Sequence, residues 1–239
     1  MERFVSEEIL DSDHCPVPEA EASLRDICRI NRWFGGVSTT RRLVERVSAS
    51  TGQKRFSVLE VAAGFGEVPR MAAMKLARKG ISLAITDLDR MASHLRPGHR
   101  GVVADALALP FRNDSFDLVS CSLFAHHLDP SQLACFVDEG LRVSRSAVLI
   151  NDLVRHPLHL ALVYAGFPLM KSYVSRLDGV ASVRRAYTPK EMRGILAHNS
   201  GDAGKVDIST HYLFRMGVIV WKPRPPATAN LVPSVKSVA

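Results

Sequence analysis

The stretch "VLEVAAGFGEVPR", residues 58–70, decides the fold of this chain. It begins with a mostly apolar run that is typical of a buried parallel strand. Gly64 and Gly66 then open a loop, and Pro69 stands in what would be the first turn of a helix. A strand that passes through a glycine loop into a helix is typical of units that hold nucleotide-like ligands. The stretch therefore predicts a ligand site at the end of this strand.

Strands and helices alternate on both sides of this stretch. We expect strands at 55–62, 81–87, 101–105, 116–121 and 146–152, and helices at 21–34, 39–50, 69–79, 130–141 and 189–200. Two further strands, 205–211 and 212–221, are separated by so short a turn that they must be antiparallel. The pattern predicts an α/β fold: a seven-stranded, mostly parallel sheet with helices on both faces and an antiparallel hairpin at its end.

The composition fits a globular enzyme or binding protein. Of 239 residues, 46% are hydrophobic and 23% charged, and the net charge of +7 is scattered in small groups. We therefore favour a solvated basic surface over nucleic-acid binding. No apolar run is long enough to span a membrane and no secretory leader is visible, so we expect a cytoplasmic protein. The cysteines (Cys15, Cys28, Cys121 and Cys135) form no CxxC pair, which predicts free thiols and no metal site.

The glycine loop is not a dinucleotide fingerprint, because Pro69 replaces the third glycine of GxGxxG. Read from the strand, the pattern is instead acidic-x-small-x-Gly-x-Gly, formed by Glu60, Ala62, Gly64 and Gly66. This resembles motif I of class I S-adenosylmethionine (SAM) methyltransferases. The glycines permit close backbone approach to the cofactor, and the Glu60 carboxylate suits its cationic end. The chain departs from the family at Ala62-Ala63, where Gly-Cys or Gly-Ser is usual.

Three further segments resemble the same family, which implies a Rossmann-like class I methyltransferase fold over about residues 55–152. Asp87, with Leu88 beside it, closes the second expected strand and would hold the ribose hydroxyls. "ADALALPF", 104–111, would place Asp105 and the Ala106 amide against the adenine. "DSFDLVSCSLFAHHL", 114–128, resembles the fourth-strand motif of ubiquinone/menaquinone methyltransferases and includes Ser122. Less specifically, segments 27–36 and 178–192 resemble bacterial small-molecule methyltransferases of polyketide-type pathways.

The substrate is expected over the fourth and fifth strands, facing the methyl group. The candidate catalytic residues are His126 and His127, and the candidate substrate-binding residues are Asp152, Arg155, Tyr164, Arg184 and Tyr187. Structural roles stay open for each: the histidines can pack or cap the next helix, Asp152 and Arg155 can form a surface pair, and Arg184-Arg185 can be a solvated basic loop. The apolar segment 156–175 is either a lid over the substrate or ordinary core.

These observations predict a SAM-dependent methyltransferase that O-methylates a small, fairly apolar molecule, such as a polyketide, a phenol or a quinone-like compound. The alternative is a catalytically degenerate methyltransferase fold that serves as a binding or regulatory protein; an NAD-dependent reductase is a third reading. We expect a helical cap or lid at 1–54, with Gly35-Gly36 as a hinge, the methyltransferase domain at 55–222 and a disordered tail at 223–239. The sequence does not determine the oligomeric state.

Overall fold

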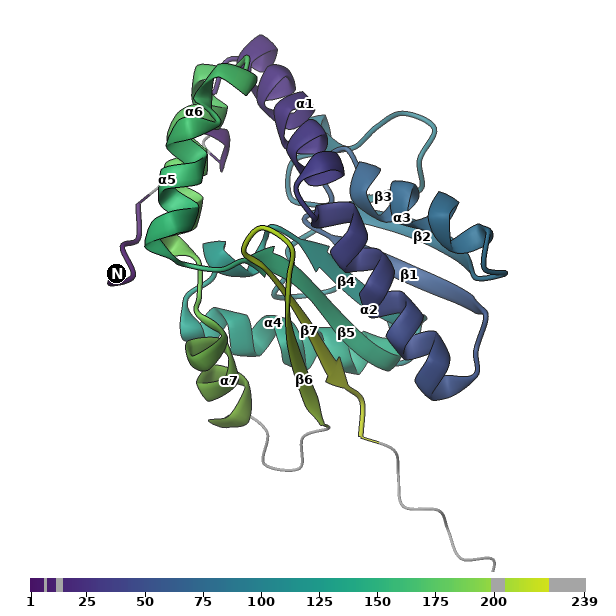
Figure 1. The fold of residues 1–239 in the computed structure, drawn as a ribbon. Coiled ribbons are helices and arrows are strands. Elements are labelled where there is room, and N and C mark those ends of the chain that lie inside the picture. Colours follow the sequence, from purple (N-terminus) through teal and green to yellow (C-terminus); the bar gives the residue numbers. More distant parts are fainter. Residues whose placement is uncertain (7, 12–14, 199–204, 224–239) are drawn as a thin grey trace, which may run out of the picture.

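The computed structural model describes residues 1–6, 8–11, 15–198 and 205–223. Its centre is one seven-stranded sheet in the order β3-β2-β1-β4-β5-β7-β6 (Figure 1). The strands are β1 (Arg55–Val61), β2 (Ser82–Asp89), β3 (Gly101–Val103), β4 (Phe116–Ser122), β5 (Ser144–Leu153), β6 (Val206–His211) and β7 (Arg215–Trp221). Strand β7 is antiparallel to both of its neighbours, and the remaining neighbouring pairs are parallel. The predicted fold class is confirmed.

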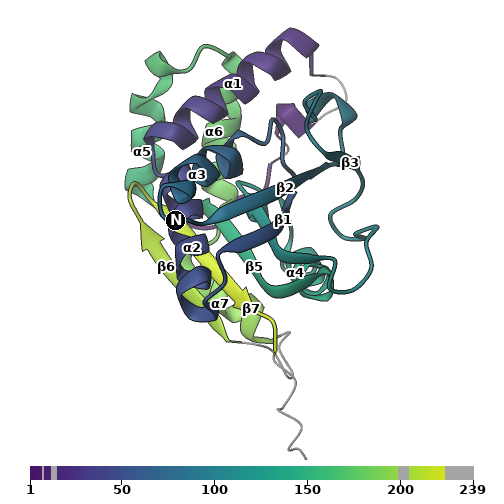
Figure 2. The ribbon, with the colours of Figure 1, turned by 90° about the vertical axis from the view of Figure 1, so that its right-hand side faces the viewer.

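Helices cover both faces of the sheet (Figures 1 and 2). On one face lie α2 (Gly36–Thr51) and α3 (Glu67–Ala77), and on the other lie α4 (Pro130–Val143) and α7 (Pro189–His198). Helix α4 begins with a capping box, in which the Asp129 carboxylate accepts the Gln132 N–H and the Gln132 side chain accepts the Asp129 N–H. Residues 199–200, the end of the helix predicted at 189–200, lie outside the described residues. So does the part of the predicted tail at 224–239.

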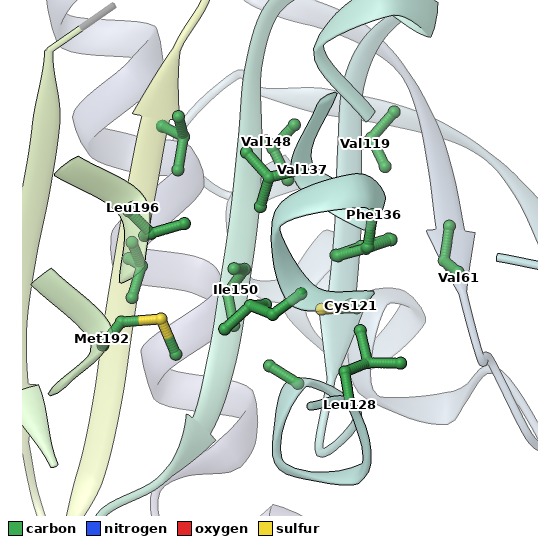
Figure 3. Packing of buried hydrophobic residues seen from close by; sticks show 14 of the residues in the cluster. Val61, Val119, Cys121, Leu128, Phe136, Val137, Val148, Ile150, Met192 and Leu196 are labelled. Atoms are coloured by element: carbon green, nitrogen blue, oxygen red, sulfur yellow. The ribbon is translucent and has the colours of Figure 1, made fainter. Parts of the chain in front are cut away.

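Two apolar layers hold the sheet between these helices. Figure 3 shows the layer under α4 and α7, where Phe136 and Met192 pack against the buried strand residues Val119 and Ile150. The opposite layer joins Leu43, Val44 and Val47 of α2 to Phe56 and Val58 of β1, together with further strand residues. Since α2 belongs to the core, the expected cap at 1–54 is too long: of its described residues, those before α2 lie outside the sheet's covering layers.

The remaining helices stand beyond the carboxyl ends of the parallel strands. They are α1 (Val17–Trp33), α5 (Pro157–Ala165) and α6 (Tyr173–Arg185), and α6 contacts both of the others. Short 3-10 turns lie at Ile9–Asp11, Ala92–His94, Ala125–His127 and Phe167–Leu169. Helix α6 was not anticipated from the sequence, because its apolar residues follow no clear helical stripe. These three helices enclose the edge of the sheet at which ligands of such folds bind.

Candidate active site

A cavity of about 740 Å³ opens at this edge of the sheet. Its walls are formed by the glycine loop, the carboxyl ends of β1, β2 and β4, and residues of α1, α5 and α6. Its volume lies in the upper part of the range for small-molecule sites, roughly 300–1,000 Å³. There is therefore room for a nucleoside-sized cofactor and a small second molecule side by side.

The loop after β1 is built from left-handed backbone. Gly64 and Gly66 have φ of +53° and +63°, and Ala62 has φ of +52°. Glycine adopts this region without strain, whereas a residue with a Cβ pays about 1–2 kcal/mol. A Cβ on Gly66 would stand 2.7 Å from the Asp87 carboxylate, so this glycine is also required by space. All three residues line the cavity, as expected from the sequence.

The two aspartates of β2 have different roles. Strand β2 continues past Asp87 to Asp89. Asp87 lies outside the cavity wall, is 1% exposed, and pairs with Arg70, whose Nη2 is 2.8 Å from Oδ2. Asp89 lines the cavity and accepts the Gly64 N–H at 2.9 Å. The expectation that Asp87 faces the ligand therefore needs correction. Asp89, two residues further along the strand, points to the same side of the sheet and lines the cavity.

Glu60 is a buried carboxyl at the floor of the cavity. It is 1% exposed, and among the described residues its Oε2 has no hydrogen-bond partner. Burial raises the pKa of Glu60 to about 7, although the hydroxyls of Ser120 and Ser122 act in the opposite direction. A cationic ligand group at Oε2 would satisfy this oxygen and favour the ionised carboxylate.

Further residues expected at the cofactor side also line the cavity: Leu88, Asp105, Ala106 and Ser122. Asp105 accepts the Leu107 N–H on Oδ1 at 2.9 Å, which fixes the turn after β3. Asp105 and Asp89 thus lie on the same side of the glycine loop, at the ends of adjacent strands. This arrangement offers two carboxylates to one polar ligand.

His126 and His127 also line the cavity, but in different environments. His126 is 2% exposed, and its Nδ1 lies 2.7 Å from Asp152 Oδ1. Burial alone would lower the pKa of His126, yet the carboxylates of Asp152 and Glu8 raise it to about 10. His126 is therefore an imidazolium at neutral pH. His127 is more exposed and stacks on Phe124.

Glu8, from the N-terminal segment, completes this polar group. Its Oε1 lies 3.6 Å from His126 Nε2 and accepts a hydrogen bond from Ser182, and its Oε2 lies 3.7 Å from His127 Nε2. Arg185 stands 3.8 Å from Oε1. The three residues Glu8, His126 and His127 offer atoms within 4.8 Å of one another, an arrangement able to hold a metal ion. The charges of His126 and Arg185 already balance the carboxylates here.

The five residues expected to bind substrate all lie outside the cavity wall. Arg155 is bound to Glu191 and to backbone carbonyls, and the Tyr187 hydroxyl donates to the Leu128 carbonyl. Asp152 is hydrogen-bonded to His126 and to the Leu153 N–H, and both of these residues line the cavity. Tyr164 is 48% exposed, and the Arg184 carbonyl accepts the Phe4 N–H. These placements differ from the expectation, because none of the five side chains lines the cavity.

Several cavity residues were missed in the sequence. Glu8, Asn31 and Arg215 face the cavity from three different elements or segments. Asp89 had a local signal, because it lies two residues after Asp87 and so on the same side of a strand. Glu8 and Arg215 had none, since each is brought to the cavity by contacts with distant parts of the chain.

The chain is similar to known proteins in sequence and in structure. Residues 59–149 match the methyltransferase domain family. No curated protein matches the sequence. Among solved structures, a SAM-dependent methyltransferase from Aquifex aeolicus is similar, with 15% identity and a TM-score of 0.54 over 86% of this chain and 98% of that one.

Two other solved structures are similar to the chain. The plantazolicin methyltransferase BpumL, in complex with SAH, has 13% identity and a TM-score of 0.65 over 90% of this chain and 93% of that one. The CMeT domain of the citrinin polyketide synthase has 14% identity and a TM-score of 0.54 over 79% of this chain and 52% of that one. At such identities the likeness establishes the fold.

None of the described helices is long and apolar enough to cross a bilayer.

Proposed function

We propose that this chain, whose residues 59–149 match the methyltransferase domain family, uses SAM to methylate a hydroxyl oxygen of a small, largely apolar molecule. The observation that carries the proposal is a single cavity that joins two unlike ends. One end has the glycine loop, Glu60 and Asp89, and the other has the polar group of Glu8, His126 and His127. A cofactor and an acceptor can therefore meet inside it.

The cofactor end fits SAM group by group. The unpartnered Oε2 of Glu60 suits the cationic amino-acid end, and the glycine backbone permits close contact with the sulfonium chain. Asp89 would accept hydrogen bonds from the ribose, and Asp105 with the Ala106 amide would face the adenine. SAM supplies a methyl group on a positively charged sulfur, a good leaving group.

The acceptor end lies over β4, where the polar group meets apolar walls. Phe124, Leu162, Val163 and Met170 are among the residues that line it. In the transfer, the acceptor oxygen forms a bond to the methyl carbon while the carbon–sulfur bond breaks and its electron pair stays on sulfur. The hydroxyl proton must leave as well. Alignment of the oxygen in such a cavity can supply roughly 7–11 kcal/mol of the barrier lowering.

The proton acceptor in this proposal is His127. His126 is already protonated at neutral pH and is tied to Asp152, so it orients the group without taking a proton. His127 borders the same cavity, with the Glu8 carboxylate beside it to stabilise the imidazolium that forms. The apolar residues of the cavity wall support an apolar acceptor. So does the likeness to a domain of a polyketide synthase and to a methyltransferase that was solved with a triazolic desmethylPZN analog.

The test begins with titration of SAM and S-adenosylhomocysteine (SAH) into the purified protein by calorimetry. We expect both to bind, and NAD not to bind. Incubation with SAM and a panel of phenols, enols, aliphatic alcohols and amines, followed by mass spectrometry, should then give a mass increase of one methylene on hydroxyl compounds. Methylation confined to the amines would show that the acceptor atom is nitrogen.

One observation favours a second function, that of a protein which binds the cofactor without catalysis. Ala62 places a methyl group and a strained backbone at a position where the family has glycine. If this loop binds SAM but holds it out of line, the cofactor will bind and no acceptor will be methylated. Restoration of turnover in Ala62→Gly would support that reading.

A further inference from the structure

Arg215 is a buried cation that the proposed reaction does not use. It begins β7, is 2% exposed and lines the cavity. Its Nη2 donates to the Asn31 side-chain oxygen of α1 at 2.9 Å, whereas Nη1 is buried without a hydrogen-bond partner among the described residues. An unpartnered polar atom of a fully buried charged group costs several kcal/mol, so it calls for an explanation.

No carboxylate in the described part of the chain pairs with this guanidinium. The carboxylate that acts on it is Asp152, which is already bound to His126 and to the Leu153 N–H. Burial lowers the pKa of Arg215 to about 10, against the opposing effect of Asp152. The arginine nevertheless stays charged at neutral pH, and none of the described carboxylates that line the cavity forms an ion pair with it.

Apolar residues accompany these polar neighbours. Leu153 is the register partner of Arg215, and Phe34, Leu153 and Leu213 line the same cavity. His159, on α5, is held neutral: burial lowers its pKa, and the charge of Arg215 lowers it further. A ligand that satisfied Nη1 would therefore combine an anionic group with an apolar body.

The position of Arg215 favours the acceptor over the cofactor as the source of that anion. In the sheet order, β7 is three strands away from β1, which carries the glycine loop. At about 4.8 Å per strand, this separates the two by roughly 14 Å. Arg215 pairs in register with Leu153, at the end of β5, where the acceptor is expected.

We infer that Arg215 and Asn31 form a carboxylate-binding site, so that the acceptor is an apolar hydroxy acid held by its carboxylate at β7. The carboxylate accepts from Arg215 Nη1, while Asn31 keeps the guanidinium aimed at the cavity. The role of the site in catalysis rests on the proposed function; the binding of the anion does not.

The experiment measures acids against their neutral amides in the SAH-loaded protein. The acid probes are 2-hydroxybenzoate and decanoate, and their neutral counterparts are 2-hydroxybenzamide and decanamide. Binding of each probe is measured by calorimetry and by thermal shift. We expect at least one acid to bind ten times or more tightly than its amide. Arg215→Met should abolish this preference. The control Arg184→Met, which removes an arginine that lies outside the cavity wall, should leave it unchanged.

A second variant distinguishes loss of acid binding from loss of folding. Asn31→Asp keeps the shape of the side chain and gives Arg215 an internal counter-ion. We expect its melting temperature to rise and its preference for acids to fall at least tenfold. If the melting temperature rises while the preference persists, the acid binds elsewhere and the inference is wrong.

Two outcomes separate the sources of the anion and the two proposals. Weaker SAH binding in Arg215→Met, with unchanged binding of the analogue of SAH that lacks the carboxylate, would assign the site to the cofactor and overturn the inference. Equal binding of acids and amides by a native protein that binds SAH would also overturn it, but leave the proposed function standing. A native protein that does not bind SAH contradicts the proposed function itself.

Discussion

The Asp89 carboxylate holds the backbone N–H of Gly64 at 2.9 Å, so the second strand braces the glycine loop that follows the first. Its second oxygen accepts the Met91 N–H at 3.0 Å. Burial alone would raise the pKa of Asp89, but His94 and these two backbone groups lower it below its ordinary value. Asp89 is therefore ionised at neutral pH and faces the cavity.

We predict that Asp89→Ala weakens SAM binding about ten- to a hundredfold, because two charge-assisted hydrogen bonds to the ribose would be lost at roughly 1.5–3 kcal/mol. Titration calorimetry measures the change. The matched control is Asp87→Asn, which should lower the melting temperature by leaving Arg70 without its partner and should affect SAM affinity less. A larger loss of SAM affinity in the Asp87→Asn control would show that Asp87, and not Asp89, binds the ribose.

Glu60 predicts a pH dependence of cofactor binding. Its pKa in the folded protein is raised to about 7, so the ionised form that a cation prefers becomes populated only as the pH rises through 7. We expect the affinity for SAM to increase between pH 6 and 7.5, and Glu60→Gln to flatten this dependence. The effect on stability has the opposite sign: ionisation of a buried carboxyl costs free energy, so the contribution of Glu60 to the free energy of unfolding falls as the pH rises from about 4.5 to 7.

The two histidines should differ when each is changed to Gln. His127→Gln is expected to reduce the single-turnover rate about a hundredfold and to remove the acidic limb of its pH profile, as loss of a general base does. His126→Gln should act mainly on stability, because it leaves the buried Asp152 without its cation, at about 3–5 kcal/mol. A fall below tenfold in both rates would mean that alignment alone carries the reaction.

The stability that the His126–Asp152 pair provides should also depend on pH. The folded pKa of His126 is raised, so its contribution is complete below pH 6.5 and is lost as the pH rises toward 10. The folded pKa of Asp152 is lowered, chiefly by His126 and against the effect of burial, so its contribution is lost at acid pH. Urea unfolding of the native protein and His126→Gln should give free energies that converge above pH 10.

Ala62→Gly is expected to stabilise the folded protein by up to about 1 kcal/mol. The gain comes from release of the left-handed strain at φ +52° and is reduced by the greater freedom of glycine in the unfolded chain. Thermal unfolding monitors the effect, with Ala63→Gly as the control at a residue for which no left-handed φ occurs. Equal effects of the two substitutions would mean that the strain at Ala62 is negligible.

The N-terminal segment should govern access to the acceptor end. Arg3 donates to the carbonyls of Arg185, His126 and Leu128, and Glu8 meets both histidines. Deletion of residues 1–15 removes these contacts without touching the core that α2 helps to form. We expect the truncated protein to fold and to bind SAH within about threefold of the native affinity, while acceptor binding falls tenfold or more. Unchanged acceptor binding would contradict a lid.

The sequence by itself determined the parts of this protein that depend on local patterns. Apolar runs that alternate with helical segments, and the short turn before β7, predicted the sheet. The resemblance of Glu60, Gly64 and Gly66 to motif I of class I methyltransferases implied a loop for SAM. Such signals lie within one strand–loop–helix unit, where chain geometry leaves few choices.

Only the tertiary structure decided which side chains face the cavity. Asp87 and Asp89 are indistinguishable by type, and the pleat alone puts both on one side; the Arg70 pair buries the first and leaves the second at the cavity. His126 became a fixed cation because Asp152, 26 residues away, reaches it. Glu8 and Arg215 meet the site across far longer separations. Their charges depend on burial and on partners from other elements, and neither is encoded in the neighbouring residues.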